Sequence, residues 1–185
     1  GALKESRRSA VNNGHAVEIL SVGTELLLGG TTNTDARDIS EMLTTIGINV
    51  FHHTVVGDNP ERLKQAMEIA MRRADIIITT GGLGPTCDDL TKNVIADALG
   101  LPLVYHPEEE ERLRTYIERR HREITPNMFQ QAYLPEGCTR FVNDWGTAPG
   151  CAIEKDGLTV IMLPGPPKEC RKMMEYRVLP YLAGK

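Results

Sequence analysis

Short runs rich in apolar and β-branched residues alternate along the chain with longer segments in which apolar residues recur every three or four positions. The runs at 16–22, 49–56 and 75–80 are each followed by a segment of helical periodicity. Alternation of this kind predicts parallel strands joined by right-handed helical crossovers. The pattern therefore predicts an α/β fold, a three-layer α/β/α sandwich around a mixed, mostly parallel sheet.

Boundary residues mark where the three predicted helices begin. Thr32 or Asn33 can cap the first helix, and Pro60 suits the first turn of the second. The third is predicted over residues 89–99, with Asp88 as its candidate N-cap. One face of the second helix is expected to be buried, and it carries Leu63, Ala66, Met67 and Ala70.

The second half of the chain is expected to complete the sheet. Residues 108–123 are highly charged and predict an exposed helix with a solvated face. Asp156 and Gly157 separate two apolar runs, which is the signal for a tight β-hairpin. Residues 1–15 are polar and without periodicity, so they are expected to form a disordered tail, and residues 16–185 are expected to form a single domain.

Composition narrows the classes of function. Of the 185 residues, 41% are hydrophobic and 25% charged, as in ordinary globular proteins. The net charge of −4 argues against extensive nucleic-acid binding, and no apolar run is long enough to span a membrane. Four cysteines without metal-ligand spacing and no visible signal peptide predict free thiols in the cytoplasm. A small anionic ligand stays compatible with this charge, because backbone N–H groups can bind phosphate.

Four turns that leave predicted strands have an unusual composition, namely 23–25, 57–59, 81–89 and 163–167. Ligands of open α/β sheets bind beyond the carboxyl ends of the strands, and the first three turns are expected at one such edge. The fourth turn and the loop 146–150 are rich in Gly and Pro, so each either lines a pocket or simply ends a strand. Convergence of these turns predicts a ligand pocket.

The stretch TTGGLGPTCDD carries the strongest chemical signal. Gly81, Gly82 and Gly84 let the backbone approach a ligand closely, Pro85 stiffens the loop and Thr86 offers a hydroxyl. The stretch is neither a P-loop, since no G-K-[S/T] follows, nor a dinucleotide-binding fingerprint. It either cradles a phosphate or forms a tight strand–helix turn. We favour the cradle, because three glycines and paired aspartates exceed what a turn needs.

Asp58, Asp88 and Asp89 are candidate functional carboxylates. A phosphate site has no use for acids unless a cation or a proton lies between them, and Mg²⁺ held by carboxylates and substrate phosphates meets that need. Asp58 could instead form the turn before Asn59, and Asp88 could cap the next helix. We favour the cap for Asp88 and a functional role for Asp89.

Taken together, the motifs resemble a known family. SVGTELLLGGTTNTDA, VVGDNPERLKQAM, TTGGLGPTCDDLTK, NMFQQAYLPEG, NDWGTAPG and MLPGPPKE occur in this order. They are similar to the N-terminal domain of the CinA (competence/damage-inducible protein A) family, in the MoaB/MogA-like molybdopterin-binding superfamily. The likeness covers residues 16–183. It implies a three-layer α/β fold with a pocket for a pterin or a nucleotide phosphate.

The resemblance also implies roles for single residues. Asp58 and Asp89 match the two aspartates that support metal-dependent chemistry in molybdopterin adenylyltransferases, which makes them catalytic candidates and candidate ligands of Mg, Mn or Co. Asp35 stands where CinA proteins often carry Asn. The residues expected to bind substrate are Thr24, Glu25, Gly81, Gly82, Gly84, Pro85, Thr86, Asp88, Thr147, Pro164, Gly165 and Pro167.

The resemblance implies a metal-dependent ADP-ribose pyrophosphatase. A molybdopterin-binding or adenylylating protein and a non-catalytic binding module are the alternatives, so whether the chain is an enzyme is left open. The expected partner is a small phosphorylated ligand. A homo-oligomer is expected, because the superfamily forms dimers and trimers. No C-terminal amidohydrolase domain, which usually follows in CinA proteins, is expected here, and so no deamidase activity.

Overall fold

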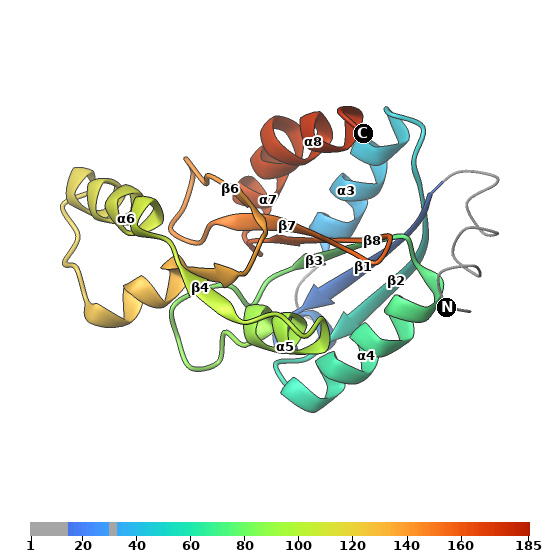
Figure 1. Ribbon diagram of the computed structural model, residues 1–185, viewed down its shortest axis with the longest axis horizontal. Coiled ribbons are helices and arrows are strands. Elements are labelled where there is room, and N and C mark those ends of the chain that lie inside the picture. Colours follow the sequence, from blue (N-terminus) through green and yellow to red (C-terminus); the bar gives the residue numbers. More distant parts are fainter. Residues whose placement is uncertain (1–14, 30–32) are drawn as a thin grey trace.

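A six-stranded mixed sheet forms the centre of the protein, with strand order β2-β1-β3-β8-β7-β6 (Figure 1). The computed structural model describes residues 15–29 and 33–185. The first four strands in this order are parallel, and β7 runs antiparallel to both of its neighbours. Their bounds are β1 Ala16–Val22, β2 Asn49–Val56, β3 Ile76–Thr80, β6 Thr139–Phe141, β7 Gly150–Lys155 and β8 Leu158–Leu163. The α/β prediction and its three adjacent parallel strands are confirmed.

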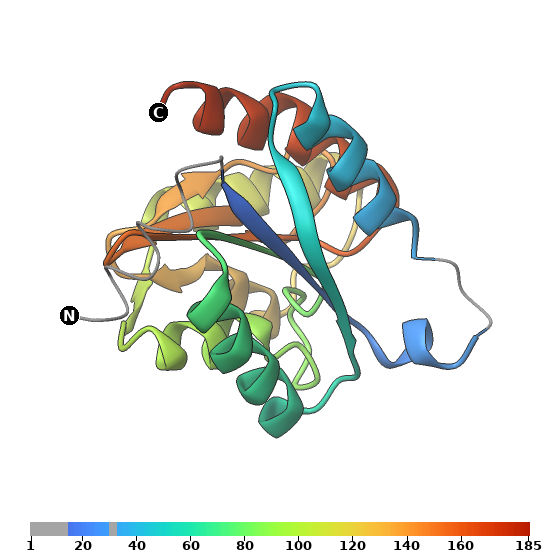
Figure 2. The same cartoon turned by 90° about the vertical axis from the view of Figure 1, so that its right-hand side faces the viewer.

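Helices cover both faces of the sheet (Figure 2). One face carries α4 (Pro60–Arg73) and α5 (Thr91–Ala98), and the other carries α3 (Thr34–Thr44) with the C-terminal helical segment. That segment comprises α7 (Pro167–Met173), a π-helical turn η2 (Met174–Val178) and α8 (Leu179–Ala183).

Alternating strand residues supply the two cores. Along β1, Leu20 and Val22 face the first helix layer while Val17 and Ile19 face the second. The predicted buried face of α4 is confirmed at Leu63, Ala66, Met67 and Ala70.

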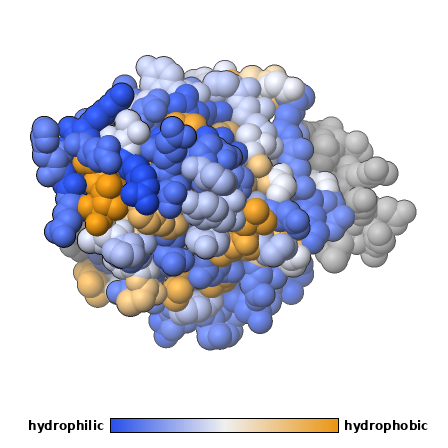
Figure 3. All heavy atoms as spheres, turned by 60° about the vertical axis from the view of Figure 1, so that its left-hand side comes forward, coloured by the Kyte–Doolittle hydropathy of each residue, from blue (hydrophilic) through white to orange (hydrophobic). Residues whose placement is uncertain are grey.

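A smaller unit projects from one end of the sheet (Figure 1). Strand β4 (Leu103–Tyr105) pairs antiparallel with β5 (Tyr133–Pro135), and between them lie α6 (Pro107–Arg119) and the 3₁₀ helix η1 (Pro126–Ala132). Figure 3 shows the side of the molecule that includes this unit, where hydrophilic residues dominate and hydrophobic ones form small separate groups. The predicted charged helix is found as α6 and many of its residues are exposed, but Glu109 in its first turn is completely buried.

Several smaller expectations can be checked in the same way. Asp156 and Gly157 both have positive φ and join β7 to β8 in the predicted hairpin. All four cysteines lie within the described residues and are free thiols. A short helix, α2 (Thr24–Leu27), follows β1 and was not predicted. The predicted tail, apart from His15, and the candidate cap Thr32 lie outside the described residues. Within 15–29 and 33–185, no helix is long and apolar enough to cross a membrane.

The predicted starts of two helices are confirmed and that of the third is wrong. Asn33 caps α3, and Pro60 stands in the first turn of α4. Asn59, which was not predicted as a cap, caps α4 by accepting the Arg62 N–H at 3.0 Å. Asp88 does not cap α5, because that helix begins only at Thr91 and its first turn receives no side-chain cap. The reason lies in the preceding loop, where a local turn around Asp89 delays the start of the helix.

The capping difference gives a direct prediction. Asn59→Ala removes an acceptor from the first turn of α4, so we expect the free energy of unfolding to fall by about 1 kcal/mol and the Tm by about 2–4 °C. Asp88→Ala removes no cap, so its stability should equal that of the parent within about 0.5 kcal/mol. Urea and thermal unfolding of both variants measure this. An equal loss in both variants would contradict the capping scheme.

Candidate functional site

A pocket of about 550 Å³ lies at the carboxyl ends of the parallel strands. It is bounded by the loops that follow β1, β2, β3 and β8, together with the start of α3 and residues 147–148. The sequence-based prediction that these turns converge is therefore confirmed. The predicted site residues that line this pocket are Glu25, Asp58, Gly81, Gly82, Gly84, Asp88, Asp89, Thr147, Pro164, Gly165 and Pro167.

Three predicted site residues lie beside the pocket rather than along its wall. Thr24 contacts Asp58 and Thr86 contacts Asp89 through hydrogen bonds, while Pro85 lies in the loop between Gly84 and Thr86. Thr24 and Thr86 thus hold the two candidate carboxylates in place through hydrogen bonds. Ligand binding by this whole set stays a prediction.

The glycines of the loop after β3 are required by the fold itself. Gly81 has φ +89° and Gly82 has φ +70°, a region that L side chains rarely adopt. A Cβ on Gly81 would overlap the Val22 carbonyl oxygen, and one on Gly82 would overlap the Thr91 hydroxyl. A Cβ on Gly84 would lie 2.7 Å from the Asp89 carboxylate. These glycines thus let the loop pass against β1 and α5 and stay in the pocket wall.

Asp58 joins the loops that follow β1 and β2. Its carboxylate oxygen Oδ2 accepts the Thr24 N–H at 3.2 Å, and its own N–H donates to the Thr24 hydroxyl at 2.9 Å. This reciprocal pair holds the carboxylate at the pocket. Asp58 is thus both a turn residue, as one interpretation expected, and a group that lines the site.

Asp89 folds the glycine-rich loop back on itself. Its Oδ2 atom accepts the Thr86 N–H at 3.0 Å and the Thr86 hydroxyl at 2.6 Å. The hypothesis that Asp88 caps the helix is wrong. Asp89 organises the loop and also lines the pocket, whereas Asp88 is exposed there.

The carboxylates suit a divalent cation only in part. Among the residues that the structure describes, no group of three His, Cys, Asp or Glu side chains could hold a metal ion. Asp58 and Asp89 line one pocket, however, and Mg²⁺ is usually bound by one or two carboxylates, water and substrate phosphates. The donor set therefore fits a cation that arrives with a phosphorylated ligand.

Two acids that sequence reasoning did not place in the site also line the pocket, Asp35 and Glu169. Glu169 accepts a hydrogen bond from the Asn143 side chain at 2.8 Å, and burial raises the pKa of its carboxyl above the ordinary range. A Cβ on Gly146 would overlap this carboxylate, which explains the first glycine of the GTAPG motif. The MLPGPPKE motif contained Glu169, but nothing in its pattern singled out the acid.

A network of ion pairs between α6 and β6 holds the loop 143–147 in place. The Arg112 guanidinium donates to the carbonyl oxygens of Asn143 at 2.6 Å, Gly146 at 3.2 Å and Thr147 at 2.7 Å. Glu109, which is 0% exposed, pairs with Arg112 at 2.7 Å and with Arg140 at 2.6 Å. A signal for this was available, because the positions 109, 113 and 117 share one helix face and the last two are apolar.

Comparison with known proteins places this fold and pocket in a family. Residues 18–184 match the model of a family described as "Probable molybdopterin binding domain". A putative competence-damage inducible protein of Acetivibrio thermocellus is 55% identical over 168 residues, which is 91% of this chain and 41% of that protein. The chain thus spans about two fifths of the length of this curated relative.

Solved structures agree with the sequence matches. The crystal structure of the protein CinA from Thermoplasma acidophilum superposes with a TM-score of 0.80 at 32% identity, covering 91% of this chain and 99% of that one. The molybdopterin biosynthesis enzyme MoaB from Thermus thermophilus gives a TM-score of 0.58 at 25% identity, covering 91% of each chain. With its fold, its pocket and these relatives, the chain belongs to the molybdopterin-binding domain family and is a CinA-like member of it.

Proposed function

We propose that this domain hydrolyses the pyrophosphate bond of ADP-ribose or a similar nucleotide in a metal-dependent reaction. One observation carries the proposal: the glycine-rich loop and the carboxylates of Asp58 and Asp89 line a single pocket at the strand ends. The pocket volume of about 550 Å³ lies within the usual range for small-molecule sites. Phosphate binding and acid groups in one cavity are what pyrophosphate cleavage needs.

Each part of the pocket has a role in this proposal. Backbone N–H groups of residues 82–84 bind the phosphate oxygens, because such turns concentrate positive partial charge. Asp58 and Asp89 hold the divalent cation, which when bound supplies Lewis-acid polarisation of the pyrophosphate. The rigid loop 164–167 and Thr147 bound the opposite wall and position the remainder of the nucleotide. Water bonds to one phosphorus and gives up a proton to the solvent, the bridging P–O bond breaks, and the products are AMP and ribose 5-phosphate.

A second candidate is supported by the family match. The matched family is described as "Probable molybdopterin binding domain", and molybdopterin carries a phosphate that a glycine-rich loop can bind. Under this hypothesis the domain holds or adenylylates the cofactor precursor. The third hypothesis, a binding module without catalysis, uses the same pocket, so direct measurement has to separate the three.

The experiment is an incubation of the purified domain with ADP-ribose and Mg²⁺, Mn²⁺ or Co²⁺ in turn. We expect AMP to appear with at least one metal and its release to stop in EDTA. A parallel incubation with molybdopterin plus ATP tests the second hypothesis, and one without substrate serves as the blank. Adenylylated molybdopterin without AMP release from ADP-ribose would favour the second hypothesis, and binding without turnover would favour the third. Light scattering of the same sample measures whether the protein is the proposed dimer or trimer.

A further inference from the structure

Asp35 is a buried acid of the pocket that the reaction proposed above does not use. It lies in the first turn of α3, two residues after the N-cap Asn33, and is 7% exposed. It lines the pocket at the strand ends, and its Oδ1 atom has no hydrogen-bond partner among the described residues. A buried carboxylate oxygen without a partner is costly, and such groups are rare in folded proteins.

The surroundings of Asp35 disfavour its charged form. Asp38 lies one turn further along the same helix and is paired with Arg171 of α7 at 3.1 Å. Burial raises the pKa of the Asp35 carboxyl to about 7, the Asp38 charge raises it as well, and Arg171 lowers it. The titratable or charged groups that face this region from the packed elements are Asp38 on α3, Glu169, Cys170 and Arg171 on α7, and His53 on β2.

These contacts indicate whether a cation or a proton neutralises the Asp35 carboxylate. A cation would need further acidic ligands beside Asp35, and no such group of three exists among the described residues. A proton needs no such ligands, and it removes the charge that makes burial of this carboxyl costly. The first turn of α3 adds backbone N–H groups that lack partners within the helix. Together they form a wall that suits an anion when Asp35 is neutral and repels it when Asp35 is ionised.

We propose that Asp35 is the proton-carrying residue of this pocket, which binds its anionic ligand with Asp35 in the neutral carboxylic acid form. Where Asp35 is ionised in the free protein, the ligand enters together with one proton taken from the solvent. The neutral carboxyl leaves no negative charge on this wall to repel the phosphates of the ligand. This proposal rests on the proposed function in one respect, since it takes the ligand to be a phosphorylated nucleotide.

The direct test is calorimetric titration with ADP-ribose in EDTA, where hydrolysis is stopped, at several pH values. The phosphates of ADP-ribose are diesters that keep their charge across neutral pH, so the ligand adds no titration of its own. We expect affinity to fall about tenfold between about pH 6 and about pH 8 as Asp35 loses its proton. Titrations in buffers of different ionisation enthalpy should show nearly one proton taken up per ligand at the higher pH.

The matched variant is Asp35→Asn, which keeps the shape and is neutral at every pH. We expect its affinity to be constant over this pH range and its proton uptake to vanish. Asp88→Asn, which removes an exposed acid from the same pocket, should keep the parent's pH slope. A flat profile in the parent, or an unchanged slope in Asp35→Asn, would overturn the proposal.

Carbon-13 NMR titration of the aspartate carboxyl groups separates this proposal from the proposed function. The proposed function is judged separately, by metal-dependent release of AMP. If ADP-ribose fails to bind in EDTA at every pH, binding needs the cation, and the NMR titration alone decides the role of Asp35. A resonance that titrates with a midpoint near pH 7 and is missing from Asp35→Asn would support Asp35 as the proton-carrying residue. A midpoint near the ordinary aspartate value of about 4 overturns it.

Discussion

Asp89→Asn lowers the turnover of ADP-ribose by about a hundredfold or more while the Tm barely changes. The substitution removes the charge that holds the cation, which should cost a few kcal/mol of transition-state stabilisation, and each 1.4 kcal/mol is about a tenfold change in rate. The loop keeps its shape, because an Asn carbonyl oxygen in the place of Oδ2 can accept both the Thr86 N–H and the Thr86 hydroxyl. Metal-dependent AMP release and thermal unfolding measure the two effects.

Two comparisons make this result specific. Asp88→Asn removes the neighbouring acid, which is exposed and has no capping role, so it should cost much less activity than Asp89→Asn. Asp97→Asn removes an exposed acid of α5 that does not line the pocket, and it serves as the unchanged control. Full turnover in a correctly folded Asp89→Asn variant would assign this acid to loop structure alone and favour the binding-module hypothesis.

Glu109→Gln is expected to have the largest effect on stability. Glu109 is completely buried between the guanidinium groups of Arg112 and Arg140, so the variant leaves two cations without their counter-charge. Breaking a buried pair from one side costs about 3–5 kcal/mol, and the glutamine oxygen still accepts one hydrogen bond, so we expect about 3 kcal/mol. For a chain of this size that corresponds to a Tm lower by about 6–12 °C.

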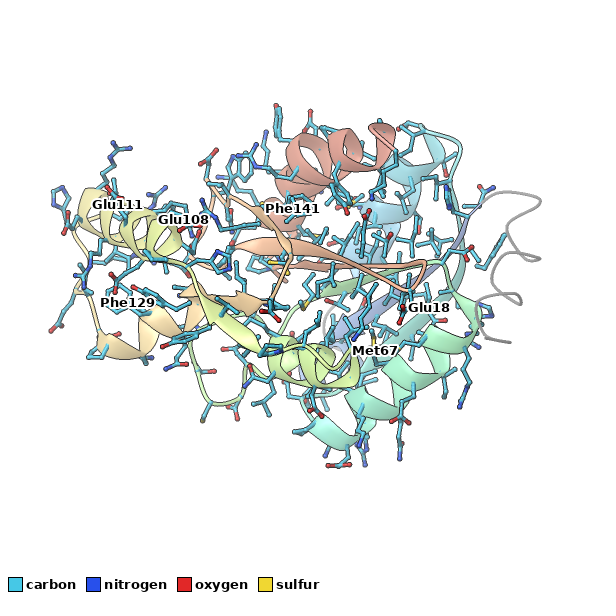
Figure 4. All side chains as sticks on the ribbon, in the orientation of Figure 1. Glu18, Met67, Glu108, Glu111, Phe129 and Phe141 are labelled. Atoms are coloured by element: carbon cyan, nitrogen blue, oxygen red, sulfur yellow. The ribbon has the colours of Figure 1, made fainter. Side chains whose placement is uncertain are left out.

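The control for Glu109→Gln is Glu111→Gln on the same helix. Glu111, labelled in Figure 4, is exposed, so its replacement should change stability by less than about 0.5 kcal/mol. Urea unfolding compares the two variants. Because Arg112 also binds the carbonyl groups of 143–147, ligand affinity of Glu109→Gln should fall as well. Equal stability of the two variants would show that the buried pair contributes nothing.

The spacing of apolar and polar residues along the chain predicted most of the fold. The buried face of α4, from Leu63 to Ala70, follows from helical spacing alone, and β3 follows from its uninterrupted apolar run. The convergence of four turns followed from the parallel arrangement, since carboxyl ends of such strands share an edge. These features depend on residues close in sequence or on the topology of a parallel sheet, and both can be inferred without coordinates.

Features that depend on distant partners were not predictable in the same way. Glu109 is buried because Arg140 pairs with it from another part of the chain and its other partner, Arg112, binds the carbonyl groups of 143–147. Asp88 matched the pattern of an N-cap, but the hydrogen bonds between Thr86 and Asp89 place the helix start beyond it. Asp35 was visible only as an acid where Asn is common, and its burial beside the pocket comes from packing of α3 against α7.

The position of β3 in the sheet has a consequence for synthesis of the chain. β3 pairs with β1 on one side and with β8 on the other, and all five of its residues are buried. During translation β1, β2 and β3 emerge early, whereas the partner on the second side comes only with residues 158–163. Until then the nascent chain carries a buried-type strand with one unpaired edge, and such edges make a chain prone to aggregate before folding is complete.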